Sequence, residues 1–371
     1  MSPTISKRAL KATRTVCIGG GTGVPASIRA LGLLGICPDV VVSVADDGGS
    51  SGLLRNHTGQ VPPGDIRKCL VALAKDPQNP WVRAFRTRLE YANDHALGNL
   101  ILTTLEKTCG SLEESITLCE QLLETTGHVY PAAFASLLLT GVTRDGLKLS
   151  GQSNICKSET ALAQVMLEPA EPLANPAAVR AIQDAELIAL GPGSLFTSII
   201  PNLLIPEIRD AICASQAATI FICPVADVQG ETWGLDAAEL TEALLAHGLR
   251  DRLDYVLINK QEQAPQPGNV TGYFSAIAQE SVKQSAQERE SAQLLAETTK
   301  TIFRPVQADA ETVTAIREQG IKVLVRPLSA WQRPSWHDPG LLAKALASLI
   351  ADSKHLPTTI YARMTKQGIN N

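Results

Sequence analysis

The sequence predicts an α/β protein with a Rossmann-like, doubly wound and mostly parallel sheet, into which a helical segment and a β-hairpin are inserted. Two observations predict this class: apolar β-branched runs alternate with helical patterns along most of the chain, and several of these runs end in glycine-rich loops. Strands buried on both faces read as continuous apolar runs, and helices connect them as crossovers. The composition agrees, because 371 residues with 44% hydrophobic but only 4% aromatic side chains predict a large aliphatic core.

The first strand is expected over residues 15–18, directly before a glycine loop and an amphipathic helix pattern. Consecutive backbone N–H groups in such a loop bind phosphate without a cationic side chain. A dinucleotide fingerprint would need glycine where Val24 stands and an acid about 20 residues further on, so NAD binding is unsupported. A Walker A loop is excluded because no lysine follows the glycines. The loop consists of Gly19, Gly20, Gly21, Thr22 and Gly23.

A second strand, expected over residues 40–44, ends in an acidic loop. Its two carboxylates could bind Mg²⁺, a sugar hydroxyl or a substrate proton, and its serines could donate to phosphate oxygens. The simpler alternative is an Asx-turn with solvated acids. Two acids followed by a glycine–serine run favour a ligand site at this strand end. The loop consists of Asp46, Asp47, Gly48, Gly49, Ser50 and Ser51.

A third candidate region begins at the turn 62–65, where Asp65 is expected to cap a helix that runs to residue 73. Asp65 and Arg67 either contact the ligand or serve as a cap and a solvated side chain. Further on, His95 and Asn99 lie four residues apart, so a helix would present both on one face. Gly98 between them costs helix stability, which predicts close packing or a nearby ligand.

The second half of the chain repeats the strand–glycine–helix arrangement. Gly191, Gly193 and Ser194 follow an expected strand and are predicted to make a second anion or nucleotide contact. A polar loop that contains Glu231 is placed at the rim of the same crevice. Hairpin strands are expected within 134–150, sheet strands over 185–190, 219–223, 253–258 and 321–325, and helices over 176–184, from 195 with a kink at Pro201, 237–247 and 339–350.

The remaining features bound the function. Residues 1–14 are basic and predict a disordered tail, with a short targeting peptide as the alternative; residues 15–371 are expected to form one domain with a Gln-rich insertion at about 260–300. A net charge of −4 argues against broad nucleic-acid binding. No apolar run reaches the length of a membrane span. Eight cysteines without CxxC or zinc spacing favour a reducing cytoplasm.

Five motifs occur in a fixed order: IGGGTG, VADDGGSSG, PPGDIRK, HALGNL and GPGSLFTSIIPNLLIP. Together they resemble the gluconeogenesis factor (YvcK-like) family of UDP-sugar-binding regulators, within the CofD-like superfamily whose enzyme branch is the 2-phospho-L-lactate transferases. The resemblance covers residues 15–258, and the wording VADDGGSSGLLR is similar to the regulator branch. The chain departs from the family at the Gln-rich insertion, where Tyr273 is the one tyrosine, and at Trp336, where the family has arginine; Arg333 lies nearby.

The resemblance implies a cytoplasmic protein with a Rossmann-like core that binds UDP-N-acetylglucosamine or a related nucleotide sugar. It implies a role that links central carbon metabolism to cell-wall synthesis and cell shape, and it is compatible with a homodimer and with protein partners in cell-wall synthesis. The alternative is an enzyme like the transferase branch, with a nucleotide-activated donor and Mg²⁺ at Asp46 and Asp47. The matching motif positions are Gly19 to Gly23, Asp46, Asp47, Ser50, Ser51, Asp65, His95, Asn99 and Gly191 to Ser194.

Overall fold

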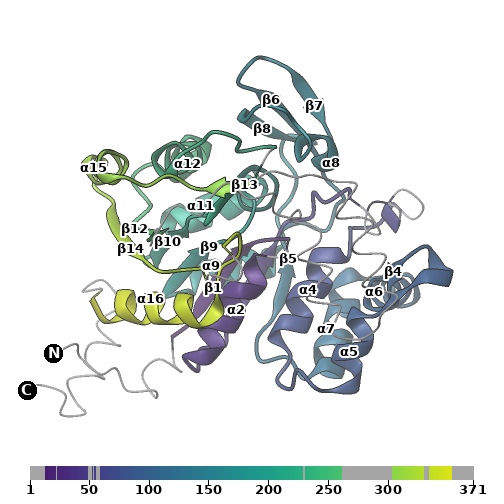
Figure 1. Ribbon diagram of the computed structural model, residues 1–371. Helices are drawn as coiled ribbons and strands as arrows, with labels where there is room; N and C mark the ends of the chain where they lie inside the picture. The colour runs from purple at the N-terminus through teal and green to yellow at the C-terminus, as the bar shows by residue number, and fades with distance from the viewer. Residues whose placement is uncertain are drawn as a thin grey trace, which may run out of the picture.

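The computed structural model describes residues 13–352, except 22, 49–51, 53, 56–58, 229, 261–302 and 330–333. Its centre is a seven-stranded parallel sheet with the order β14-β12-β10-β9-β1-β2-β5 (Figure 1). β1, β9 and β10 are buried along their whole length, as the apolar runs predict. The strands are β1 Thr15–Gly19, β2 Asp39–Val42, β5 Val129–Pro131, β9 Leu187–Leu190, β10 Ala218–Ile222, β12 Tyr255–Asn259 and β14 Lys322–Arg326.

Helices cover the sheet as a doubly wound fold requires. α2 packs against α4 and lies beside the C-terminal helix α16 (Figure 1), α9 packs against α11, and α12 packs against α15. Capping residues fix where several of these helices begin. The Asn175 side chain caps α9, which starts with a proline, and Asp236 and Glu239 form a capping box at the start of α12. The helices are α2 Val24–Leu33, α4 Gly64–Leu73, α9 Pro176–Gln183, α11 Pro206–Ala214, α12 Ala237–Leu244, α15 Ala310–Glu318 and α16 Pro339–Asp352.

The strand order reverses between β1 and β9. β1 pairs with β2 on one side and with β9 on the other, and Ile18 is the register partner of both Val41 and Leu190. The carboxyl ends of these strands therefore lie at one level. In open α/β sheets the ligand crevice forms outside the carboxyl ends at such a switch point. The glycine loops after β1 and β9 both begin there.

Two insertions extend from the sheet. The helical one contains α5 Pro80–Arg86, a short pair of strands β3 Arg88–Leu89 and β4 His95–Ala96, α6 Leu97–Cys109 and α7 Leu112–Leu123. The predicted hairpin is confirmed as β6 Leu138–Thr143 and β7 Lys148–Ser150, which turn at Gly146. A third strand that was not predicted, β8 Leu162–Glu168, completes this small sheet, which projects from the core (Figure 1). β11 Ala226–Val228 and β13 Phe303–Pro305 form a further pair.

Two local predictions are wrong. Asp65 is not an N-cap, because the helix begins one residue earlier behind Pro63. His95 and Asn99 do not share a helix, because left-handed residues at 93 and 94 end the preceding turn, and His95 then enters β4. The helix expected from residue 195 does begin there, but its first turn, Leu195–Ile199, is π-helical and leads into α10 Ile200–Leu203. The Asn202 side chain donates to the Ser198 and Ile199 carbonyl oxygens within that turn.

Most of the expected tail, 1–12, and of the insertion, 261–302, lies outside the described residues, as do Tyr273 and Arg333. The single-domain division therefore stays a prediction. Within the part of the chain that the structure describes, no helix has the length and apolar character needed to cross a bilayer.

Candidate functional site

The loops after β1 and β9 contact each other through backbone. A Cβ placed on Gly23 would lie 2.1 Å from the Pro192 carbonyl oxygen and 2.7 Å from the Cα atom of Gly193, so only glycine fits there. Ser27 from α2 donates to the Gly191 carbonyl oxygen at 2.8 Å. Glycine backbone thus brings the two loops together at the switch point, where Gly19, Gly20, Gly21, Gly191, Gly193 and Ser194 also lie. Thr22 is outside the described residues.

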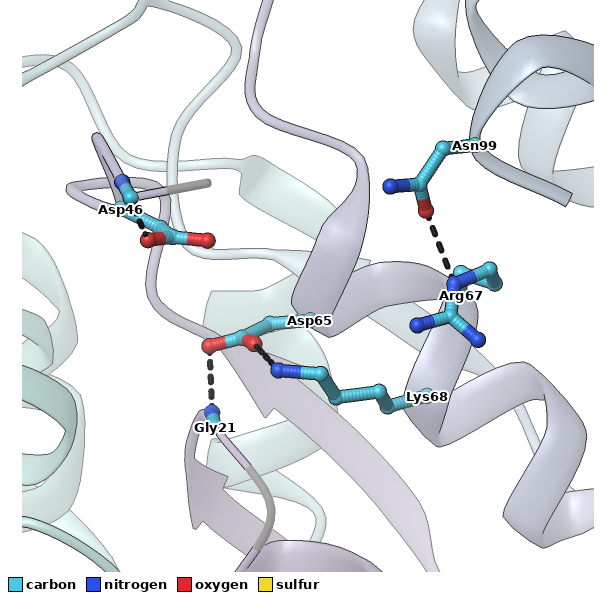
Figure 2. A network of polar contacts seen from close by, with 7 residues as sticks. Gly21, Asp46, Asp65, Arg67, Lys68 and Asn99 are labelled. Atoms are coloured by element: carbon cyan, nitrogen blue, oxygen red, sulfur yellow. Dashed lines mark hydrogen bonds and ion pairs between the residues drawn. The ribbon is translucent and has the colours of Figure 1, made fainter. Parts of the chain in front are cut away.

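Asp65 fixes the shape of the first loop. One carboxylate oxygen accepts a hydrogen bond from the Gly21 backbone N–H, and the other pairs with Lys68 Nζ at 2.8 Å (Figure 2). Gly21 has a φ of +61°, a conformation that glycine adopts without a Cβ penalty. The carboxylate that the sequence assigned to a helix cap therefore joins α4 to the glycine loop across the sheet edge.

Lys68 is a site residue that the sequence reasoning missed. Burial disfavours its charged form, but the carboxylates of Asp65 and Asp46 outweigh burial and raise its pKa. The ammonium group therefore stays charged, and the side chain remains 31% exposed beside the first glycine loop. Lys68 does not directly follow the glycines in the sequence, so the Walker A pattern does not identify it. The available signal was its spacing of three residues from Asp65 at the start of a helix.

The acidic loop is anchored through hydrogen bonds to backbone. Asp46 Oδ1 accepts from the Gly48 N–H at 3.0 Å, the Asx-turn that was the simpler alternative. Asp47 Oδ1 accepts from the Ser153 N–H at 2.8 Å, which joins this loop to α8 Gln152–Ile155 of the hairpin insertion. Gly49, Ser50 and Ser51 lie outside the described residues. Among the described residues, no three His, Cys, Asp or Glu side chains gather as a metal site.

Arg67 and Asn99 are hydrogen-bonded to each other, although they belong to different helices. Arg67 Nε donates to Asn99 Oδ1 at 2.8 Å (Figure 2). Its Nη1 donates to the Phe85 carbonyl oxygen at 3.4 Å. Burial, together with the nearby charge of Arg88, lowers the pKa of Arg67 to about 10. This pKa is still well above neutral pH, so the guanidinium stays charged. This contact joins α4 to the helical insertion. His95 is also buried there, in β4.

Glu231 lies beneath the second glycine loop, deeper than the rim position that the sequence predicts. Its side chain is 8% exposed, and burial raises its pKa to about 7, while the hydroxyl groups of Thr197 and Ser194 and the Thr197 N–H act against this rise. Its backbone carbonyl accepts from the Leu162 N–H of β8. An acid directly after a strand-end glycine was the signal in the sequence.

A cavity of about 480 Å³ opens at the opposite edge of the sheet. Arg14, Asp39, Tyr130 and Arg180 are among the residues that line it, around the amino ends of β1 and β2. None of the predicted site residues is among its lining residues. Ligand sites of doubly wound sheets lie at the carboxyl edge, so we place the candidate site at the glycine loops.

Comparisons with known proteins agree with this architecture. The family model described as "2-phospho-L-lactate transferase CofD" matches residues 15–301. A Nostoc protein named "Putative gluconeogenesis factor" is 40% identical over 70% of this chain, and this chain spans 58% of its length. A Streptococcus pyogenes protein of the same name is 37% identical over 67% of this chain and 79% of its own.

Solved structures give the same result. A UPF0052 family member from Bacillus halodurans is 30% identical to this chain, with a TM-score of 0.75 over 90% of this chain and 98% of its own. The two glycine loops and the switch point lie within the residues that the family model matches. Since the family model matches most of the chain and the Streptococcus pyogenes relative, at 37% identity, is covered over 79% of its own length, the chain belongs to the CofD family.

Proposed function

We propose that this protein is a non-catalytic regulator that binds a nucleotide sugar of the UDP-N-acetylglucosamine type and links central carbon metabolism to cell-wall synthesis and cell shape. The observation that carries the proposal is the pair of glycine loops in backbone contact at the switch point. Such loops suit the close approach of a diphosphate. The name carried by the Nostoc and Streptococcus relatives supports a role in carbon metabolism.

The charges around the loops support a phosphorylated ligand with hydroxyl groups. Lys68 provides a cation beside the first loop, and Asp46 and Asp47 provide acceptors that suit sugar or ribose hydroxyl groups. Glycine backbone and one lysine would hold the phosphates, and the acidic loop would select the sugar. A homodimer in the cytoplasm and protein partners in cell-wall synthesis belong to the same proposal.

Isothermal titration of the full chain with UDP-N-acetylglucosamine, UDP-glucose and GDP tests the proposal. We expect saturable binding of at least one UDP-sugar without divalent metal and without turnover. Absence of binding to both UDP-sugars at millimolar concentration would overturn it.

Lys68 supplies a sharper version of this test. Replacing it with methionine keeps the stem but removes the charge, and a charge-assisted hydrogen bond contributes roughly 1.5–3 kcal/mol, so we expect affinity to fall by about tenfold or more. Lys75→Met is the matched control, because Lys75 is exposed and lies just beyond the C-terminal end of the same helix. Equal affinities in the two variants would show that Lys68 does not contact the ligand.

A transferase is the second candidate, favoured by the description of the family model and by the paired acids. The carboxylates of Asp46 and Asp47 fit a Mg²⁺ ion, which proteins commonly hold through one or two carboxylates together with substrate phosphates. Bound Mg²⁺ would neutralise charge on transferring phosphoryl groups. Metal-dependent turnover with a nucleotide-activated donor and a deazaflavin acceptor, lost in Asp46→Asn, would establish this function in place of the regulator.

A further inference from the structure

Glu231 is an unusual buried acid beside the loop that we propose to contact the ligand. Its side chain is 8% exposed, and Oε2 has no hydrogen-bond partner among the described residues. Its polar neighbours are Ser194 and Thr197, which flank the start of the π-helical turn. A buried carboxylate oxygen without a partner is costly, and proteins keep such groups mainly where a site uses them.

Ser194 is the important neighbour, because a serine hydroxyl group both donates and accepts hydrogen bonds. Ser194 has one proton to donate, whereas an ionised carboxylate can only accept. Beside ionised Glu231, the Ser194 proton is drawn to the carboxylate, and only oxygen lone pairs are left for the crevice. Beside protonated Glu231, the acid can donate to Ser194, whose own proton is then available to an anion. Ser194 is half-buried, so its hydroxyl group can serve both sides.

We infer that Glu231 is a positioning residue that sets the direction of the Ser194 hydroxyl, and that binding of an anionic ligand at the loop 191–194 is accompanied by the uptake of one proton at Glu231. The inference rests on the proposed function, since it concerns the phosphate-contacting loop of that site. It assigns no chemical step to Glu231, which acts through Ser194.

The surroundings of Glu231 are suited to this proton uptake. Burial already brings its pKa to about 7, against the opposing effect of Thr197 and Ser194. Cys156, at the end of α8, is a titratable group that interacts with it, and desolvation of the sulfur atom raises the pKa of that thiol and keeps it neutral. Within its own loop, Asp227 is paired with Arg304 at 3.0 Å. A bound diphosphate would disfavour the ionised form of Glu231 further.

Isothermal titration of the full chain with UDP-N-acetylglucosamine, repeated in buffers of different ionisation enthalpy, tests the inference. The diphosphate of a nucleotide sugar is substituted at both ends and does not titrate near neutral pH, so any proton uptake comes from the protein. Above pH 7 we expect uptake approaching one proton per ligand and an affinity that falls by up to about tenfold per pH unit. A buffer-independent enthalpy together with a flat affinity profile would overturn the inference and leave the proposed function intact.

Variants separate Glu231 from other titrating groups. Glu231→Gln retains an N–H donor toward Ser194, so we expect ligand affinity at high pH to rise and both proton uptake and pH dependence to disappear. Glu106→Gln is the matched control, because burial also raises the pKa of Glu106, on α6. It should bind and take up protons like the wild type.

Ser194→Ala tests the intermediate step. We expect this variant to bind more weakly and with a flatter pH profile, because the group that Glu231 orients is gone. Proton uptake that persists unchanged in Glu231→Gln or in Ser194→Ala would contradict the inference. Lack of binding by the wild-type protein overturns the proposed function itself, and the inference with it.

Discussion

At the scale of single residues, the site depends on side chains that join one loop to another. Asp65 is 7% exposed and accepts hydrogen bonds from Gly21 of the glycine loop and Lys68 of its own helix. The same carboxylate thus shapes the loop and holds the cation beside it. The sequence identified Asp65 but not its partners, because Gly21 lies 44 residues away along the chain.

Replacing Asp65 with alanine should therefore destabilise the protein. The substitution leaves the Gly21 N–H without its acceptor and Lys68 without its counter-charge, and we expect a loss of roughly 2–4 kcal/mol in the free energy of unfolding. Thermal unfolding followed by circular dichroism measures this as a lower midpoint. Asp210→Ala removes an ion pair whose acid is 68% exposed and should change little. Similar midpoints for the two variants would contradict the role of Asp65.

At the scale of elements, close packing determines where α4 meets the helical insertion. Gly98, in the first turn of α6, faces Phe85 of α5 and the aliphatic part of Arg67 of α4. The prediction that this glycine marks close packing is confirmed, because a Cβ there would lie 2.7 Å from Phe85 Cδ1 and 2.8 Å from Arg67 Cδ. The helix that was expected to carry both His95 and Asn99 begins at Leu97, so only Asn99 lies on it, because local spacing cannot reveal the left-handed residues at 93 and 94.

Two glycine-to-alanine substitutions should accordingly have opposite effects. Gly98→Ala forces the packed side chains apart, and overpacking of this kind costs typically about 1–3 kcal/mol. Gly32→Ala, in α2, meets no atom within 4 Å and should stabilise the protein by about 0.5–1 kcal/mol through helix propensity and reduced chain entropy. Chemical denaturation of both variants measures the difference. An unchanged free energy of unfolding in Gly98→Ala would show that the packed side chains move apart easily.

At the scale of the whole molecule, the C-terminal segment returns to the core. α16 packs on α2, and just before it His337 Nε2 lies 3.1 Å from the carbonyl oxygen of Cys223, directly after β10. A carbonyl oxygen only accepts, so this nitrogen carries a proton and the ring is held as a neutral donor. Burial lowers the pKa of His337 to about 4, with the hydrogen bond to Cys223 opposing this shift.

The protein should therefore lose stability in acid through His337. Because its pKa is lower in the folded than in the unfolded state, its contribution is present above about pH 6.5 and is lost as the pH falls toward 4, up to about 3 kcal/mol. His337→Gln keeps a donor and should flatten this part of the stability profile in urea titrations. His128→Gln should not flatten it, because the hydrogen bond that the His128 ring donates to the Glu120 carboxylate raises the pKa of His128, and its contribution to stability changes with pH in the opposite direction. An unchanged acid profile in His337→Gln would exclude this residue as the cause.

The sequence by itself determined the alternation of strands and helices, the glycine loops at two strand ends and the family resemblance. Each of these is written in consecutive residues, where period, turn chemistry and motif spacing act locally. The tertiary structure decided that β1 and β9 are neighbours, that Asp65 holds Gly21, and that Lys68 and Glu231 lie at the loops. These contacts join segments far apart along the chain, and only the packing of the sheet and its helices fixes which side chains meet.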